Sequence, residues 1–139
     1  SKTIKDKINS KIKYREEFRP FCPSVLEKNI ESQFIGKFAS PFMNLNMNCK
    51  NKTIKSYPSI AHVDGTARVQ SVSKVKGQDY YELLNYLDKN GIKSLLNTSL
   101  NINEQPLVNT PIEALQTFFC SGLDILYLEN FKIKKNNKN

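Results

Sequence analysis

The chain has 139 residues, a length that suits one domain burying roughly two-thirds of its unfolded surface. Hydrophobic residues make up 39% of it and charged residues 24%, with only 5 Gly and 6 Pro, which excludes a disordered or fibrous protein. Its first 13 residues are charged throughout and no apolar stretch approaches the ~20 residues of a membrane helix, so we expect neither a signal peptide nor a membrane segment.

The net charge of +8 is concentrated at the two ends of the chain. Residues 1–19 contain seven basic and three acidic side chains, residues 131–139 contain four basic and no acidic ones, and the segment between them contains ten of each. We expect residues 136–139 to form a disordered basic tail. Nucleic-acid binding is not favoured, because the sequence has no RNP motif, zinc-finger spacing or Gly-X-X-Gly clamp.

Residues 3–13 show the first amphipathic pattern. Isoleucines at four-residue spacing define one face and lysines occupy the others, so the spacing predicts a helix with Thr3 as its cap. We expect an extended, partly buried strand over residues 18–26, where two prolines exclude a helix. A short helix over residues 27–34 should follow.

The next part of the chain is expected to contain a strand, a loop and a turn. Residues 41–48 loosely alternate apolar and polar side chains, as a strand does, whereas residues 49–58 are rich in Lys and Asn and are interpreted as a mobile loop. Asp64 and Gly65 mark a turn, and the alternation over residues 68–75 predicts a strand.

Two well-marked helices are predicted in the second half. Residues 79–90 place apolar side chains at i, i+3, i+4 and i+7, with Asp79 as the cap and Gly91 as the stop. After a short buried strand over residues 94–99, a Thr-Pro start and a Glu in the first turn predict a helix over residues 110–119.

Closing strands are predicted over residues 124–128 and 131–135. Helices and strands thus alternate irregularly and without an internal repeat, which favours an α/β or α+β domain with a mixed sheet.

The cysteines and the single histidine carry little catalytic signal. Cys22, Cys49 and Cys120 are widely spaced and form no Cys-X-X-Cys pair, so we interpret them as reduced thiols of a cytoplasmic protein and expect no zinc site or disulfide framework. A Cys nucleophile would need His62 as its base, which makes a Cys–His enzyme an unfavoured reading.

Three of the 21 basic residues are arginines, namely Arg15, Arg19 and Arg68. Because a guanidinium presents a planar fork of donors that suits carboxylates and phosphates, we treat these three as candidate anion-binding residues. Ordinary surface or ion-pairing roles stay open for them.

Three segments are richer in polar groups than a core or a surface requires. Lys13 and Arg15 would project to one side of an extended stretch and suit a polyanionic ligand. The turn before Arg68 could present backbone N–H groups beside its guanidinium. Residues 97–101 follow a strand, where α/β sheets hold ligands. Each segment alone also fits a loop that local side-chain bonds stabilise.

Taken in order, these segments resemble the C-terminal domain of the O-carbamoyltransferase family, which includes the nodulation-factor, cephamycin and tobramycin carbamoyltransferases. The resemblance covers nearly all of residues 8–134. Its motifs are NSKIKYREEFRPFCPSVL at residues 9–26, SPFM at 40–43, HVDGTARVQ at 62–70 and NTSLN at 97–101, followed by EQPLV at 104–108 and Thr110-Pro111.

The resemblance implies a YrdC-like fold for residues 1–135, a twisted mixed β-sheet with flanking helices. In the family this domain takes carbamoyl phosphate and ATP and makes carbamoyl-adenylate. An N-terminal domain of the actin/hexokinase-like superfold holds a metal and transfers the carbamoyl group to an acceptor hydroxyl. The implied partners are therefore these small molecules and that N-terminal domain, with Mg²⁺ accompanying ATP and no metal ligand in this chain.

The chain begins without Met just past the point where the family has a Glu-Phe-Gly-Pro-Arg-Ala-Leu-Gly-type motif of the same ligand site. We therefore expect an N-terminally truncated domain that is weakly active or inactive in isolation.

The resemblance also assigns the site. The family marks its cavity with a Lys-x-Arg pair and a Ser-x-Asn pair, which Lys13-Tyr-Arg15 and Ser99-Leu-Asn101 match, although Phe is usual where Leu100 stands. Catalysis is assigned to Lys13, Arg19 and Arg68. Binding of substrate and ATP is assigned to Lys13, Arg15, Arg19, Arg68, Thr98, Ser99 and Asn101.

Electrostatics agrees with this assignment, because the two substrates bring about six negative charges together and cations offset their repulsion. No general base is required, so His62 is interpreted as a hydrogen-bonded turn residue and Ser24 as a cap of the next element. Two alternatives stay open: an RNA- or nucleotide-binding YrdC-like module without catalysis of its own, and a structural domain whose cavity has decayed.

Overall fold

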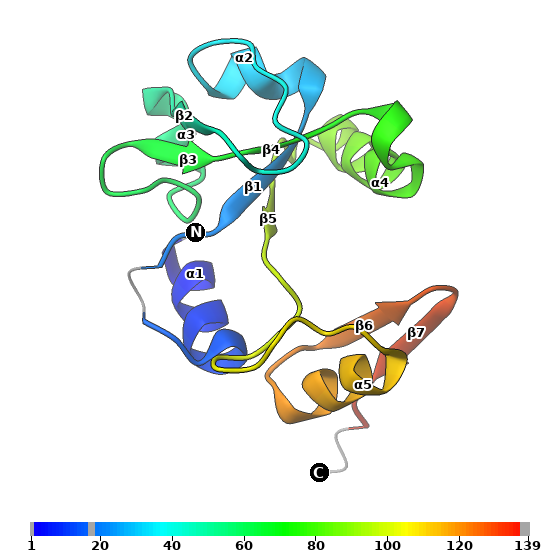
Figure 1. Cartoon of the computed structure of the whole chain (residues 1–139). Coiled ribbons are helices and arrows are strands. Elements are labelled where there is room, and N and C mark those ends of the chain that lie inside the picture. Colours follow the sequence, from blue (N-terminus) through cyan, green and yellow to red (C-terminus); the bar gives the residue numbers. More distant parts are fainter. Residues whose placement is uncertain (1, 17–18, 137–139) are drawn as a thin grey trace. The chain divides into compact units, whose positions relative to one another are not determined.

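The structure is a computed structural model that describes residues 2–16 and 19–136, and it divides into two compact units. The central unit is built from residues 20–98, together with the first two residues of the chain. The terminal unit combines residues 3–19 with residues 99–139. Helices and small sheets are mixed in both units, which confirms the predicted α+β class (Figure 1).

A three-stranded sheet with the order β4-β1-β5 organises the central unit. The middle strand β1 (Cys22–Leu26) pairs in parallel with β4 (Gln70–Val72) and antiparallel with β5 (Leu95–Asn97). All five residues of β1 are buried, as expected of a strand that is paired on both edges (Figure 1).

A second, two-stranded sheet pairs β2 (Asn46–Asn48) with β3 (Thr66–Arg68) in antiparallel register. The sequence predicts one strand here, but the structure has two, because β3 pairs with β2 while β4 pairs with β1. The chain changes sheets at Val69, which is fully buried.

Short helices complete the central unit. After β1 come η2 (Glu27–Asn29) and α2 (Ile30–Gln33), as predicted. The 3₁₀ helix η3 (Lys74–Lys76) precedes α4 (Gln78–Lys89). The core has two clusters, and it contains the following buried side chains: Val25, Ile30, Phe34, Met47, Cys49, Ile60, Ala67 and Val69 in the first, and Leu26, Val72 and Leu84 in the second.

The predicted loop over residues 49–58 is wrong, because this segment contains the helix α3 (Asn51–Ser56). Thr53 is 2% exposed, and its Oγ1 donates a hydrogen bond to the carbonyl of Gln33 at 2.6 Å. Ile54 packs against the first core cluster. These tertiary contacts stabilise a helix that the Lys- and Asn-rich composition does not indicate.

All of α1 (Lys2–Ile8) except its first residue belongs to the terminal unit, and this helix continues directly into the π-helix η1 (Asn9–Lys13). Its second part consists of α5 (Pro111–Cys120) and the hairpin of β6 (Ile125–Leu128) with β7 (Phe131–Lys134). In Figure 1, α5 lies against this hairpin. The buried core of this unit is formed by Ala114, Phe118 and Leu126.

The predicted helix ends are confirmed in part. Thr110 caps α5 in a reciprocal capping box with Glu113, and Gly91 follows α4 with a positive φ of +84°. Asp79 is not the cap of α4, because Gly77 occupies that position and Asp79 lies in the first turn. Thr3 is not a cap either, since α1 begins at Lys2.

The basic C-terminal segment is ordered as far as the structure describes it. Lys132 and Lys134 belong to β7, and the ammonium of Lys135 donates a hydrogen bond to the carbonyl of Ser121. Of the predicted tail, residues 137–139 lie outside the described residues. Within residues 2–16 and 19–136, no helix has the length and apolar character needed to span a bilayer.

Candidate functional site

Lys13 is the last residue of η1 and the centre of the candidate site. Tyr14 ends this helix in the left-handed conformation, with a φ of +49°, and its backbone N–H donates to the carbonyl of Asn9. The predicted extended stretch that would point Lys13 and Arg15 to one side is therefore wrong. The helix ends at Lys13, as the spacing predicts, but its last five residues form a π-helix, and π-helical turns often occur at functional sites.

The side chain of Lys13 is buried against the segment that follows β5. Its Nζ lies 2.9 Å from the carbonyl oxygen of Ser99 and 3.4 Å from Ser99 Oγ. The distances to the carbonyl oxygen and to Oδ1 of Asn101 are 2.7 and 2.5 Å. Ser99 Oγ in turn donates to Asn101 Oδ1 at 2.7 Å. The structure thus brings together the Lys of the first pair and both members of the Ser-x-Asn pair.

Among the residues that the structure describes, no acidic group pairs with Lys13. Its residue is only 4% exposed, and in the described part of the chain no carboxylate lies within 4 Å of its Nζ. Burial, together with the positive charge of Arg15, lowers the pKa of Lys13 to about 8. A buried ammonium beside a second cation favours the approach of an anion.

Asn9 connects the two N-terminal arginines of the candidate site, Arg15 and Arg19. Its side chain is fully buried: Oδ1 accepts from Nε of Arg15 at 2.9 Å, and Nδ2 donates to the carbonyl of Arg19 at 3.1 Å. The half-exposed guanidinium of Arg19 lies 3.2 Å from Glu16. Sequence reasoning missed Asn9, although an amide that interrupts an Ile/Lys helix pattern was a signal for it.

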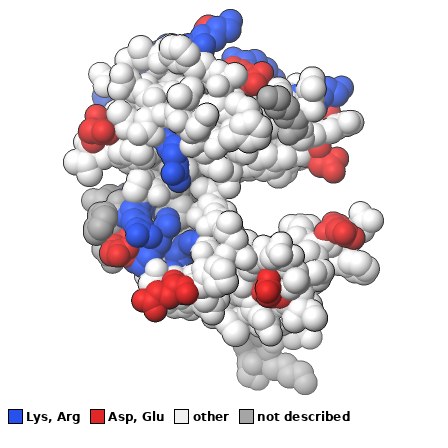
Figure 2. Space-filling model, in the orientation of Figure 1, with Lys and Arg blue, Asp and Glu red and all other residues white. Residues whose placement is uncertain are grey.

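The face shown in Figure 2 carries a group of blue side chains over α1 and η1. These elements contain many basic residues and few acidic ones. The positive charge predicted for the N-terminal segment therefore lies on the surface of the terminal unit.

Arg68 and Thr98 belong to the central unit. Arg68 is the exposed last residue of β3, and its Nε lies 3.1 Å from Sγ of Cys22. Thr98 is exposed and directly follows β5. The other predicted site residues belong to the terminal unit, namely Lys13, Arg15, Arg19, Ser99 and Asn101.

Two backbone N–H groups of the turn before Arg68 are used within the turn itself. The N–H of Gly65 donates to the carbonyl of His62, and that of Thr66 donates to Oδ1 of Asp64. The bonds from the backbone and hydroxyl of Thr66 lower the pKa of Asp64. His62 Nδ1 lies 3.1 Å from Oγ1 of Thr66, which confirms that His62 is a hydrogen-bonded turn residue.

A polar network crosses the three-stranded sheet of the central unit. Oε1 of Gln70 accepts from Ser24 Oγ and from Asn97 Nδ2, both at 2.6 Å. Asn97 Nδ2 also lies 3.8 Å from the sulfur of Met43, which has a positive φ of +56°. Ser24 is therefore a residue in the middle of β1 and not the predicted cap. The network attaches the SPFM segment to the sheet.

The chain's own side chains suit anions better than metal ions. Among the described residues, no group of three or more His, Cys, Asp or Glu could hold a metal ion. All three cysteines are free thiols. Burial, with a contribution from the charge of Asp64, raises the pKa of Cys49 to about 11, so this thiol is not a thiolate at neutral pH.

Fold and geometry together define a small α+β domain with a cationic cluster, in which the buried Lys13 lies beside Arg15, Ser99 and Asn101. The sequence profile described as "Carbamoyltransferase C-terminus" matches residues 1–135. The chain belongs to this family.

The chain is also similar to several curated proteins. It is 39% identical over 137 residues to nodulation protein NolNO of Sinorhizobium fredii, an alignment that covers 96% of this chain and 20% of that protein. Nodulation protein NolO of Bradyrhizobium diazoefficiens is 38% identical over 135 residues, with coverage of 94% and 25%. An uncharacterized protein of Methanocaldococcus jannaschii is 36% identical over 132 residues, with coverage of 94% and 22%. The chain thus spans a fifth to a quarter of these relatives.

Proposed function

We propose that this chain is the part of an ATP-dependent O-carbamoyltransferase that binds carbamoyl phosphate and ATP and forms carbamoyl-adenylate. Family membership supports a carbamoyltransferase, and one observation carries the site: the buried ammonium of Lys13, beside Arg15 and without a carboxylate within 4 Å among the described residues. A second domain of the same polypeptide would pass the carbamoyl group to the acceptor hydroxyl. Because both substrates are cytoplasmic metabolites, the reaction would take place in the cytoplasm.

The proposed reaction needs charge stabilisation more than proton transfer. Hydrolysis of carbamoyl phosphate yields carbamate and phosphate. A carbamate oxygen then attacks the α-phosphorus of ATP, and the bond from that phosphorus to the bridging oxygen breaks as pyrophosphate leaves. In this step the carbamate oxygen is already a nucleophile, so no side chain has to remove a proton. The cations of the site offset the repulsion between the two anions.

Lys13 would act in this site as a fixed charge. An ammonium has three protons, and four oxygen atoms of Ser99 and Asn101 lie within 3.4 Å of its Nζ. The ammonium is therefore held before substrate arrives, and no reorganisation of its own hydrogen bonds is required. The guanidinium groups would make the direct contacts with phosphate oxygens, for which their forked geometry is suited.

Mg²⁺ would be held by the phosphates of ATP and by water. The cationic cluster contains an ammonium, guanidinium groups, a hydroxyl and an amide, whereas Mg²⁺ prefers carboxylate and phosphate oxygens. Bound in this way, the ion would supply further neutralisation of the phosphate charge.

The decisive experiment measures binding of ATP and of carbamoyl phosphate by calorimetry, with Lys13→Met compared against Lys11→Met. Lys11 is an exposed lysine of the same π-helix, so its replacement removes the same charge outside the cluster. We expect Lys13→Met to weaken binding by about tenfold or more, as loss of a charged contact does, and Lys11→Met to change it little. Equal affinity in both variants, with circular dichroism showing both folded, would refute the assignment.

Activity should be tested separately from binding. We expect the chain alone to release pyrophosphate slowly or not at all, and a protein of the relatives' full length to release it readily. Arg68→Lys in that longer protein tests whether the guanidinium of the central unit is needed, since Lys keeps the charge and loses the fork. Pyrophosphate release at the full-length rate by the chain alone would contradict the first expectation.

The RNA-binding alternative makes a different prediction. RNA binding through phosphate contacts would fall steeply as salt rises and would not need Mg²⁺. Titration with ATP and with an RNA oligonucleotide at two salt concentrations therefore separates the two functions.

A further inference from the structure

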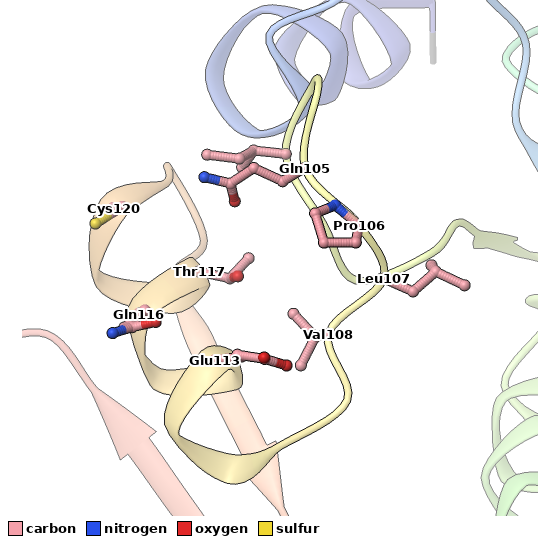
Figure 3. A pocket seen from close by; sticks show the side chains of 9 residues that line it. Gln105, Pro106, Leu107, Val108, Glu113, Gln116, Thr117 and Cys120 are labelled. Carbon is pink, nitrogen blue, oxygen red and sulfur yellow. The ribbon is translucent and has the colours of Figure 1, made fainter.

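The terminal unit contains a cavity of about 290 Å³, and none of the residues of the cationic cluster lines it (Figure 3). One wall is formed by the segment from Ile102 to Val108, and the other by residues of α5 from Glu113 to Cys120. In Figure 3 the sticks of Gln105, Val108, Glu113 and Thr117 lie around the same space.

The wall formed by residues 102–108 is held in place by hydrogen bonds. Asn101 Nδ2 donates to the carbonyl of Gln105 at 2.9 Å, and the backbone N–H of Val108 donates to the carbonyl of Leu100 at 3.1 Å. The backbone N–H of Gln105 donates to the carbonyl of Ile102. A cavity with a fixed wall is present before a ligand arrives, which lowers the cost of binding.

Thr117 gives this cavity a polar group that the protein itself does not use. The residue is 6% exposed and lines the cavity (Figure 3). Within the described chain, its hydroxyl makes no hydrogen bond, although a helical Thr commonly donates to the carbonyl four residues earlier. No buried polar side-chain atom of the described residues lacks a partner, so this hydroxyl is open to the cavity. A hydroxyl that lines a cavity and is not used by its own helix can exchange hydrogen bonds with a polar ligand atom.

The charge of the cavity is opposite to that of the cationic cluster. Oε2 of Glu113 accepts from the backbone N–H groups of Asn109 and Thr110 at 2.7 and 3.1 Å, and these bonds lower the pKa of Glu113. Its carboxylate is therefore ionised at neutral pH. The lining contains no Lys or Arg. Such a cavity disfavours phosphates and favours a ligand with N–H donors.

We propose that this cavity binds a small amine or primary amide that carries a branched apolar group. The N–H donors would face the Glu113 carboxylate and the Thr117 hydroxyl, and the apolar group would lie against Pro106, Leu107 and Val108. A volume of about 290 Å³ is at the lower end for ligand pockets and suits a molecule about as large as an amino-acid side chain.

Three probes of the same shape test this proposal: isobutylamine, isobutyramide and isobutyrate. They share the branched apolar group and differ in the head group, which is an ammonium, an amide or a carboxylate. Binding to the whole chain is followed in ¹H–¹⁵N NMR spectra and by the rate at which iodoacetamide alkylates Cys120, which lines the cavity and is exposed, whereas Cys22 and Cys49 are buried. We expect the amine and the amide to shift the signals of residues 102–117 and to slow alkylation, and isobutyrate to bind about tenfold more weakly.

Two near-isosteric variants assign the contacts. Glu113→Gln removes the charge but keeps an acceptor for the capping box, so it should weaken the amine and leave the amide unchanged. Thr117→Val removes the hydroxyl and keeps the shape, so it should weaken both. Glu82→Gln, at an exposed position of α4, is the matched control and should change neither.

Two outcomes would overturn the proposal. One is equal binding of isobutyrate and isobutylamine, and the other is the absence of shifts at residues 102–117 with either nitrogen probe up to its solubility limit. Because all measurements are made without ATP or carbamoyl phosphate, they stand or fall independently of the carbamoyl-adenylate reaction.

Discussion

Lys13 combines burial with contacts to neutral oxygen atoms, and this combination has a measurable consequence. Its pKa is lowered from 10.5 to about 8, so the ammonium loses its proton as pH rises through about 8. We expect the ¹³Cε signal of Lys13 to titrate near pH 8, and the affinity for inorganic phosphate to fall over the same range. A Lys13→Met protein should show no such fall, and an unchanged phosphate affinity up to pH 10 in the unmodified chain would contradict the expectation.

The same shift affects stability with a defined sign. Because the pKa of Lys13 is lower in the folded state than in the unfolded state, the unfolded chain binds more protons between about pH 8 and 10.5. The shifted pKa of Lys13 therefore lowers the free energy of unfolding by a constant amount below about pH 8. This destabilisation decreases as pH rises through the window. Urea denaturation of the unmodified chain and Lys13→Met across the window measures the difference.

Asn101 offers a second test at the level of a single residue. Asn101→Asp places a carboxylate where Oδ1 now lies 2.5 Å from Nζ of Lys13, which should raise the pKa of Lys13 above about 8 and weaken phosphate binding. Asn103→Asp is the matched control, because it adds the same charge to an exposed side chain of the same loop. Equal phosphate affinity in the two variants would show that the cluster does not bind the anion.

At the scale of elements, the capping box at the start of α5 is a local device with a predictable contribution. Thr110 Oγ1 accepts from the N–H of Glu113 at 3.2 Å, and the Glu113 side chain accepts from the N–H of Thr110. Thr110→Ala should lower the free energy of unfolding by about 1 kcal/mol. Urea denaturation measures this effect, and Glu113→Gln, which keeps the reciprocal acceptor, should show much less of it.

The end of α5 is joined to η1 at a position that requires glycine. The N–H of Gly122 donates to the carbonyl of Lys11 at 2.8 Å, and a Cβ at Gly122 would lie 2.6 Å from that carbonyl oxygen. Gly122→Ala should therefore destabilise the terminal unit by about 1–3 kcal/mol and weaken phosphate binding, since Lys13 lies in the same π-helix.

Gly91→Ala is the control for this variant. Gly91 also disfavours a side chain, because its φ is +84°, but a Cβ there would meet no atom within 4 Å. The control should lower stability and leave phosphate binding unchanged. If both variants bind phosphate equally well, the Gly122 contact does not position the cluster.

At the scale of the whole molecule, the central unit has its own ionic network. Asp88 accepts from Lys93 Nζ at 2.5 Å and from Asn29 Nδ2 at 2.9 Å, and Lys28 Nζ lies 3.0 Å from its other oxygen. The bond from Lys93 is the main cause that lowers the pKa of Asp88 to about 2. Asp88 therefore stabilises the folded chain above about pH 3.8, and this contribution is lost as pH falls through about 2.

Asp88→Asn tests that contribution and the division into two units. The variant should be less stable than the unmodified chain at pH 6, and the difference should vanish near pH 2. In hydrogen exchange at pH 6, amides of residues 20–98 should lose protection while those of residues 99–136 keep theirs. Asp79→Asn, at an exposed position of the same helix, is the control. A uniform loss of protection would mean that the two units unfold together.

The sequence alone predicts the features whose causes lie within a few residues. The Thr-Pro start of α5, the helix over residues 3–13 and the two closing strands are all confirmed. The motifs of the carbamoyltransferase family are likewise readable from the sequence, and the family is confirmed. Caps, helical periodicity and short motifs act locally, so their effect does not depend on what packs against them.

Tertiary structure decided the remaining features of the fold and the site, because these features depend on contacts between residues that are distant in the sequence. The hydrogen bond between Lys13 and Ser99 joins residues 86 positions apart. The family resemblance places both residues in one site, but it does not show that the ammonium of Lys13 is buried. The helix α3 depends on the hydrogen bond from Thr53 to the carbonyl of Gln33. The strand predicted after the turn is divided at Val69, because its first half pairs with β2 and its second half pairs with β1. The sequence thus determined the local elements and the family, whereas long-range packing determined which polar side chains are buried together and therefore where charge is left unbalanced.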